Sequence, residues 1–192
     1  MVNWRRYILC SCLLLAGGIG RPVVAETVPF REYEIKAAFL FNFAQFIEWP
    51  AQAFTNASTP FVIGVIGDIS DNRFGHVLNQ IMQGETIAGR RIMLKFPRQF
   101  EELAGCHILF IGRSEQARLS QILSLVNRAG VLTVGESDSF TRFGGIINFI
   151  TRDNKVRFEL HLDNAARAGL KIDAKLLKVA QVIAAPNRAE GR

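Results

Sequence analysis

The histidines, acids and serines of this sequence form no pattern that predicts catalysis or metal binding. His76, His107 and His161 lie far apart, and none belongs to an H-E-x-x-H pattern, in which one helical turn brings two imidazoles to a metal ion. Asp68 and Asp71 could form a carboxylate pair, but two acids in a loop are more commonly solvated. The G-x-S-x-G nucleophile elbow of hydrolases is absent. We therefore predict no catalytic residue, no metal site and no cofactor.

Two glycine-containing segments could bind a phosphate or another anion. Gly64–Asp68 follows a strand-like run, where a dinucleotide-binding loop would lie, but it lacks the G-x-G-x-x-G spacing that lets the backbone approach a pyrophosphate. No Walker loop occurs. Gly89, Arg90 and Arg91 could hold an anion between paired guanidinium groups, or they could form a turn with a charged strand edge. The sequence leaves both interpretations of the arginine segment open.

The densest apolar segment after the N-terminus is Tyr33–Pro50, which we predict to be a helix ended by Pro50. Its apolar residues fall into two stripes at helical spacing. One stripe contains Ile35, Ala38, Phe39, Phe43 and Phe46, and the other contains Tyr33, Ala37, Leu40, Phe41, Ala44 and Ile47. A surface helix needs only one apolar stripe. Either the helix is sandwiched inside one core, or it packs on its own domain with the first stripe and on a partner with the second.

The second stripe supplies our first set of candidate contact residues, Leu40, Phe41 and Ile47, with Glu48 and Trp49 at the end of the helix. Phe41 and Trp49 stand out because aromatic side chains are enriched in interface hot spots.

A second set of candidate contact residues lies on the last predicted strand, where Arg157, Glu159 and His161 alternate with apolar residues and share a polar face. This face could equally be an ordinary solvated strand face.

The N-terminal segment Met1–Ala25 has the three parts of a secretory signal. Arg5 and Arg6 form a positive start, Tyr7–Ile19 is mostly apolar, and small residues precede a cut after Ala25. The apolar run is shorter than the roughly 20 residues of a membrane span, although an uncleaved anchor is the alternative. Both interpretations predict an exported protein, with one domain at residues 26–185 and a loose tail at 186–192.

Charge and cysteine content change when the predicted leader is removed. Three of the 23 basic residues and none of the 17 acids leave, so the net charge falls from +6 to +3. No basic run interleaved with aromatic residues remains, and we predict no nucleic-acid partner. Cys106 becomes the single cysteine, which excludes an internal disulfide. It opens an apolar run, which favours a buried thiol over an intermolecular disulfide.

The remaining chain alternates short apolar runs with helical patterns. Continuous apolar strands separated by helices predict an α/β fold with a mostly parallel, Rossmann-like sheet covered by helices on both faces. A C-terminal antiparallel hairpin is expected around Arg152–Asn154. The expected strands are 61–67, 91–96, 107–112, 131–134, 145–150 and 156–162, and the expected helices are 74–82, 114–130, 163–168 and 173–184.

Several blocks of the sequence are similar, in order, to the YfiR family of exported bacterial proteins. The matching blocks are Glu34–Pro50, Gly67-Asp68 with Phe74-Gly75, Gly89-Arg90, Cys106–Ile111 with Ser114-Glu115, Leu132–Glu136, Phe140, Gly144–Phe149, Val156–Glu159 and Ala168–Ala180. The resemblance implies a periplasmic α/β domain that forms homodimers and acts as a regulator, not an enzyme. Some members of the family are tuned by disulfides, which Cys106 alone cannot supply internally.

The resemblance also implies a function. A founding member represses a diguanylate cyclase of the inner membrane by binding its periplasmic sensor region, which lowers cyclic di-GMP. We therefore expect a regulator that binds such a sensor protein. The rival expectation is a periplasmic small-ligand binding module, with its cleft at the carboxyl ends of parallel strands near Gly67-Asp68 and Gly112-Arg113.

Overall fold

A computed structural model describes residues 28–67, 74–126 and 130–183. The predicted leader with its cut after Ala25 and the predicted tail at 186–192 lie outside the described residues, and so do Asp68 and Asp71. None of the helices in the described ranges combines the length and the apolar character needed to cross a membrane.

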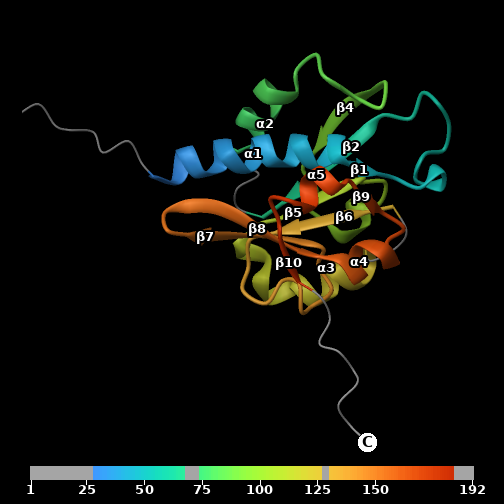
Figure 1. Ribbon diagram of the computed structural model, residues 1–192. Coiled ribbons are helices and arrows are strands. Elements are labelled where there is room, and N and C mark those ends of the chain that lie inside the picture. The colour runs from blue at the N-terminus through green and yellow to red at the C-terminus, as the bar shows by residue number, and fades with distance from the viewer. Residues whose placement is uncertain (1–27, 68–73, 127–129, 184–192) are drawn as a thin grey trace, which may run out of the picture.

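An eight-stranded sheet forms the centre of the fold (Figure 1). Its strands are β2 (Phe61–Ile66), β3 (Thr86–Ile87), β4 (Arg90–Lys95), β5 (Ile108–Ile111), β6 (Leu132–Gly135), β7 (Ile147–Arg152), β8 (Lys155–His161) and β10 (Gln181–Ile183). The spatial order is β10-β8-β7-β6-β5-β2-β4-β3. The strands from β7 to β4 run parallel, whereas β8 and β3 are antiparallel to their neighbours β7 and β4. The predicted α/β class and mostly parallel sheet are confirmed, while the closer likeness to a Rossmann sheet stays a prediction.

The central strands are buried on both faces, which explains their continuous apolar sequences. Successive side chains of a strand point to opposite faces, so Ile63 and Val65 join one core while Val62 and Ile66 join the other. Helices cover both faces. They are α1 (Val28–Phe46), α2 (Phe74–Met82), α3 (Leu119–Val126), α4 (Leu162–Arg167) and α5 (Ala174–Leu177). Figure 1 shows α1 and α2 on one side of the strands and α3 on the other.

Helix α1 ends earlier than predicted, at Phe46 instead of beside Pro50. Ile47 and Glu48 form a short strand, β1, which pairs antiparallel with β9 (Lys171–Ile172) in a separate two-stranded sheet. The proline restricts the conformation only of the residue before it, Trp49. The pairing with β9 already holds Ile47 and Glu48 in an extended conformation, so the helix ends before them. The helix periodicity could not reveal this partner because β9 lies far along the sequence.

The segment before α3 also differs from the prediction. A helix capped by Ser114 was expected, but a 3-10 helix, η4 (Arg113–Arg118), precedes α3, and the residue preceding η4 is Gly112. Helix α2 has the predicted bounds, and the hairpin of β7 and β8 is confirmed. Its turn residues Asp153 and Asn154 both have positive φ, 51° and 57°, as a type I′ hairpin turn requires.

The predicted C-terminal helix 173–184 is wrong. Helix α5 ends at Leu177, and Gln181–Ile183 become β10, parallel to β8. The apolar residues of this segment fit a helix by spacing, but the free edge of β8 offers backbone hydrogen bonds that a longer helix would leave unused. Val179, which lies between α5 and β10, is 66% exposed.

Candidate functional site

The second apolar stripe of α1, predicted to be free for a partner, is largely buried, and the first stripe is only partly buried, with Phe43 in the core. Leu40 and Ile47, expected on a surface for partners, are 0% and 5% exposed in the core. Ile35, expected in the core, is 40% exposed, and Ala38 is exposed too. The expectation of a spare face with Leu40 and Ile47 is therefore wrong. Two apolar stripes of similar composition give no sequence signal for which one meets the sheet. Phe41, from the same predicted set, is half-buried against the core.

Glu48 and Trp49 lie where the chain leaves α1, beside the two-stranded sheet. The Glu48 carboxylate accepts a hydrogen bond from Lys171 Nζ at 2.9 Å, across the strand pair. Trp49 meets Phe61 edge-on, with ring centroids 4.8 Å apart, and its indole N–H donates to the carbonyl of His107 at 3.2 Å. Trp49 is therefore fixed by contacts on both its ring and its nitrogen.

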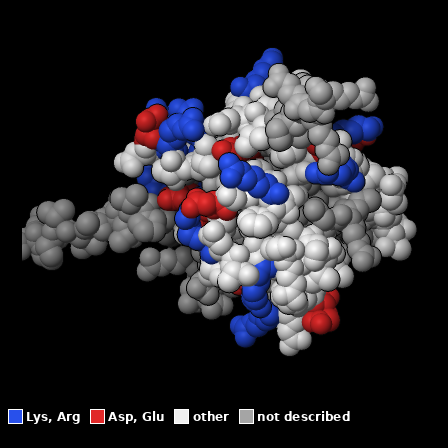
Figure 2. Space-filling model, turned by 90° about the horizontal axis from the view of Figure 1, so that it is seen from below, with Lys and Arg blue, Asp and Glu red and all other residues white. Residues whose placement is uncertain are grey.

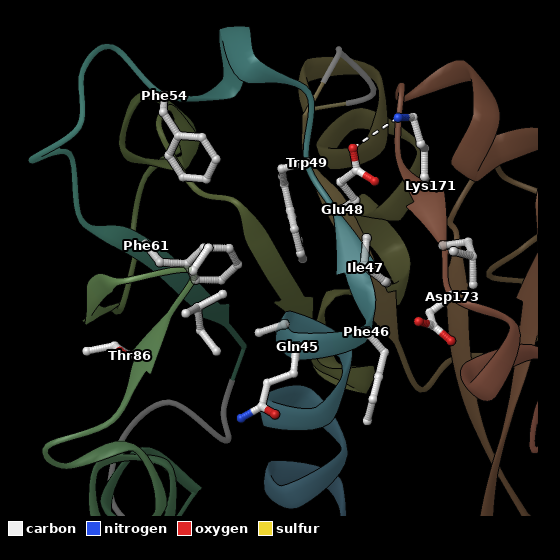
Figure 3. Close-up of a pocket in the computed structure, with 14 residues that line it drawn as sticks. Gln45, Phe46, Ile47, Glu48, Trp49, Phe54, Phe61, Thr86, Lys171 and Asp173 are labelled. Atoms are coloured by element: carbon white, nitrogen blue, oxygen red, sulfur yellow. Dashed lines mark hydrogen bonds and ion pairs between the residues drawn. The ribbon is translucent and has the colours of Figure 1, made fainter.

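These two residues line a groove of about 690 Å³ (Figure 3). Its walls come from the end of α1, from β1, from the loop after Pro50, and from β3 and β9. The lining residues are Ala44, Gln45, Phe46, Ile47, Glu48, Trp49, Phe54, Phe61, Thr86, Ile87, Ala88, Lys171, Ile172 and Asp173. Figure 3 shows Trp49 between β1 and the rings of Phe54 and Phe61, with the Glu48–Lys171 pair on the other side of β1.

His107 holds the aromatic wall of this groove in place. Its ring stacks against those of Phe54 and Phe61, at centroid distances of 4.5 and 5.0 Å. Nδ1 accepts the N–H of Val62 at 3.0 Å, so Nε2 carries the proton and donates to the carbonyl of Ala53 at 3.0 Å. Burial lowers the pKa of His107, and the charge of Arg90 lowers it further. His107 is therefore a buried histidine whose two ring nitrogens are both hydrogen-bonded.

Arg90 stabilises the loop that follows Pro50. Its guanidinium lies 4.0 Å from the centroid of the Phe54 ring, a cation–π contact. Its Nη1 donates to the carbonyls of Asn56, Ala57 and Thr59 at 2.8 to 3.0 Å. The guanidinium of Arg90 is therefore occupied by contacts within the protein. These contacts favour the interpretation of Gly89–Arg91 as a turn with a charged strand edge over an anion-binding site. Phe54 is an aromatic residue in a polar loop, and this was a sequence signal for the groove wall. We did not predict a role for Phe54 from the sequence.

The second predicted set lies on β8, with Arg157 exposed and Glu159 and His161 half-buried. Phe158 and Leu160 between them belong to the core on the α1 side, so the three polar residues share the opposite face. His161 also has a structural role, because its Nδ1 accepts the N–H of Asn164 at the start of α4, at 3.4 Å. The structure places this set on a different face of the sheet from the α1-side core that borders the groove.

A buried ion pair lies at the carboxyl ends of the parallel strands. Lys36 of α1 and Glu136, which follows β6, are each 5% exposed in their side chains, with Nζ and Oε2 2.5 Å apart. The Tyr33 hydroxyl donates to Glu136 at 3.4 Å, and the N–H of Arg113 donates to it at 3.2 Å. Burial and the Glu136 charge raise the pKa of Tyr33 to about 12. The sequence reasoning missed this pair, although Lys36 interrupts the apolar stripe that faces the sheet.

The groove lies at the opposite end of the sheet from the cleft expected for a ligand module. Phe61 begins β2 and His107 precedes β5, so the groove is at the amino ends of these strands. At their carboxyl ends, Gly67 and Gly112 pack closely, because a Cβ on Gly67 would lie 3.3 Å from Gly112 Cα. Asp68, the other residue of that expected cleft, lies outside the described ranges.

The described residues offer no metal centre: no group of three or more His, Cys, Asp or Glu side chains in these ranges is placed to hold an ion. Cys106, the cysteine that the structure describes, is buried with a free thiol, and burial raises its pKa to about 11. The predicted buried thiol is confirmed. On the face shown in Figure 2, Lys and Arg are interspersed with Asp and Glu and do not gather into one patch.

Comparison of the sequence with known proteins identifies the family of this chain. No curated protein matches the chain at a significant level. The sequence model of a family described as YfiR/HmsC-like matches residues 33–181, which span α1, all strands of the main sheet up to the first residue of β10, and the groove. The match covers most of the chain, and the resemblance predicted from the ordered sequence blocks is confirmed. The chain belongs to the YfiR/HmsC-like family.

Proposed function

We propose that this protein is an exported periplasmic regulator that binds the periplasmic sensor region of an inner-membrane diguanylate cyclase and represses it. The YfiR/HmsC-like family is one of periplasmic regulators of diguanylate cyclase signalling, and the match over residues 33–181 carries the proposal. Repression of the cyclase lowers cyclic di-GMP in the cell. This role requires a binding surface and no catalytic group.

The mechanism that we propose is selective binding to one sensor conformation. A ligand shifts a two-state equilibrium only by its difference in affinity for the two states, and couplings of about 1–3 kcal/mol are typical. A domain with a sheet buried on both faces and fixed groove walls suits this task, because it can hold the bound sensor in a single arrangement.

The proposed contact surface is centred on Trp49, with Glu48 beside it and Phe41 on the neighbouring flank of α1. Leu40 and Ile47 support this surface from the core, where they are buried. Trp49 combines a large ring with a fixed orientation, and rigid aromatic side chains make frequent hot spots. Arg157, Glu159 and His161 on β8 remain the alternative surface.

Homodimer formation remains part of the proposal. Ile35 and Ala38 on the outer flank of α1 are exposed, and they offer a surface for a second copy that is separate from the groove. Light scattering of the purified protein would give its oligomeric state. A monomer at micromolar concentration would contradict this part of the proposal and leave sensor binding unaffected.

The test of the function is the level of cyclic di-GMP in cells with and without the protein, together with co-purification of its partner from membranes. Deletion should raise cyclic di-GMP, and a membrane-bound cyclase should be recovered with the tagged protein. Trp49→Ala should reproduce the deletion, whereas Gln52→Ala, an exposed position outside the groove lining, should not. Unchanged cyclic di-GMP with a different receptor recovered would contradict repression of a cyclase.

The second candidate function is a small-ligand binding module that serves another membrane receptor. The observation in its favour is the groove, because about 690 Å³ falls within the range of roughly 300–1,000 Å³ typical of small-molecule sites. Thermal unfolding measured with fractions of cell extract would detect such a ligand as a rise in Tm. No rise across many fractions would argue against this candidate without affecting the first.

A further inference from the structure

The groove lies between two strands that each have one unpaired side. β3 is the last strand of the main sheet, and β1 belongs to the two-stranded sheet with β9. Ala44–Trp49, which includes β1, and Thr86–Ala88, which includes β3, line the groove, whereas β4, the neighbour of β3, contributes none. The groove therefore includes the open side of β3. In Figure 3, Thr86, Phe54 and Phe61 lie on the side of β1 away from Lys171, and Lys171 and Asp173 line the groove on the other side.

The backbone of β1 has hydrogen-bonding groups available on that side. Asp173 N–H donates to the carbonyl of Phe46 at 2.9 Å, and Glu48 lies opposite Lys171. In an antiparallel ladder, alternate residues direct their backbone groups to the partner strand. Phe46 and Glu48 thus face β9, and Ile47 and Trp49 face the groove. Among the described residues, no turn, loop or side-chain hydrogen bond engages the Ile47 carbonyl or the Trp49 N–H.

The lining residues on the Trp49 side of β1 carry no charge. Trp49, Phe54 and Phe61 form an aromatic wall there, and Ile87 lines the same side at 4% exposure. The charged lining residues Glu48, Lys171 and Asp173 lie on the other side of β1 (Figure 3), where Glu48 and Lys171 pair at 2.9 Å. An occupant with free charges beside Trp49 would lose hydration without gaining a partner, so this side of the groove complements an uncharged segment.

We propose that this groove binds an extended, uncharged peptide segment of a partner protein, which adds to β1 as a further strand. Strand addition of this kind takes its affinity from main-chain hydrogen bonds and its selectivity from pockets for alternate side chains. The Ile47 carbonyl and the Trp49 N–H supply the main-chain groups, and the aromatic wall receives the side chains. The proposal does not depend on which partner carries the segment or on whether that partner is a cyclase.

Trp49 reports directly on the groove in a simple experiment. The chain has two tryptophans, Trp4 and Trp49, so Trp4→Phe in the full chain leaves Trp49 as the single fluorophore. The probes are a panel of uncharged pentapeptides that alternate Val, Leu, Ile or Phe with Ser or Thr, each paired with a version N-methylated at alternate amides. We expect a saturable change in Trp49 fluorescence, at least about tenfold weaker for one methylated series, because methylation removes the backbone donors.

A pair of variants separates the groove from other surfaces. Thr86→Arg fills the groove from an exposed position and should weaken peptide binding at least about tenfold, whereas Gln83→Arg, exposed but outside the lining, should not. Equal binding of methylated and unmethylated peptides would overturn strand addition, and so would a panel in which no peptide changes the fluorescence. A fluorescence change that follows protein concentration without peptide would assign the groove to a second copy and also overturn the proposal.

Discussion

The imidazole of His107 has both nitrogens hydrogen-bonded and stacks against two phenyl rings. Protonation would replace the acceptor at Nδ1 with a donor that faces the N–H of Val62. Because the ring also links the strand starts to the loop after Pro50, its neutral form stabilises the groove wall. A histidine that a sequence search examines as a metal ligand is here a structural residue.

This arrangement predicts an acid-sensitive stability. Burial lowers the pKa of His107 in the folded state below the value near 6.5 of the unfolded chain. Above that value, both states are neutral at this site. As the pH falls below it, the unfolded state binds the proton first, so the free energy of unfolding decreases until the folded pKa is passed.

Urea denaturation at about pH 7.5 and about pH 5.5 measures this loss. His107→Gln should be less stable at the higher pH and should show a smaller decrease between the two values. A decrease of the same size in the wild type and the variant would assign the acid sensitivity to other groups.

The ion pair of Lys36 and Glu136 gives a second prediction at the residue scale. With both side chains 5% exposed, Lys36→Met would leave the Glu136 carboxylate buried without its main partner, which should cost about 3–5 kcal/mol of unfolding free energy. The double variant Lys36→Met/Glu136→Leu should recover much of this loss, since no buried charge then remains. Chemical denaturation of the three proteins measures the coupling. A cost below about 1 kcal/mol for the single variant would mean that the pair is solvated.

At the scale of the element, α1 buries most of one apolar stripe and only part of the other, of which Phe43 lies in the core. Leu40 and Ile47 meet the sheet, and Ile35 and Ala38 stay outside. Lys36 lies on the buried stripe because Glu136 receives its charge at the end of β6. Periodicity alone could not show which stripe meets the sheet, because both contain apolar residues at helical spacing.

Matched truncations on α1 distinguish the two stripes. Leu40→Ala should lower the free energy of unfolding by about 2–5 kcal/mol, because it opens a cavity in a fully buried site. Ile35→Ala, at 40% exposure, should lower it by less than about 1 kcal/mol. Denaturant unfolding of both variants is the measurement. The reverse order would restore the original assignment of the stripes.

At the scale of the whole molecule, two sheets meet around the end of α1, and their junction forms the groove. Glu48 and Lys171 connect the strands of the smaller sheet, with side chains 69% and 77% exposed. An exposed pair of this kind adds little stability, so its position beside Trp49 matters more for binding than for folding.

Glu48→Gln should therefore separate function from stability. The free energy of unfolding should change by less than about 1 kcal/mol, because the pair is solvated. If Glu48 belongs to the sensor contact, cyclic di-GMP should rise in cells that carry the variant. Lys155→Gln, a change at an exposed end of the β7–β8 hairpin, is the matched control. Normal repression by the Glu48 variant would remove this residue from the proposed surface.

Features that depend on local pattern could be predicted from the amino-acid sequence. Continuous apolar runs gave the buried strands around Ile63 and Phe110, helical spacing gave α2, and Asp153-Asn154 gave the hairpin. These predictions agree with the structure because side-chain periodicity and turn chemistry depend on residues close together in the sequence. The ordered blocks also identified the family.

Strand pairs and ion pairs between distant segments could not be predicted from the sequence and became visible in the folded structure. The pairing of β1 with β9, of β10 with β8, and of Lys36 with Glu136 joins residues far apart in the sequence. Each of these three pairings differs from what the neighbouring residues alone predict. The physical reason is that buried backbone groups and buried charges need partners, which can come from distant parts of the chain. The groove follows from the same cause: its walls come from five separate segments of the chain, and Phe54 in a polar loop was a signal for one wall only.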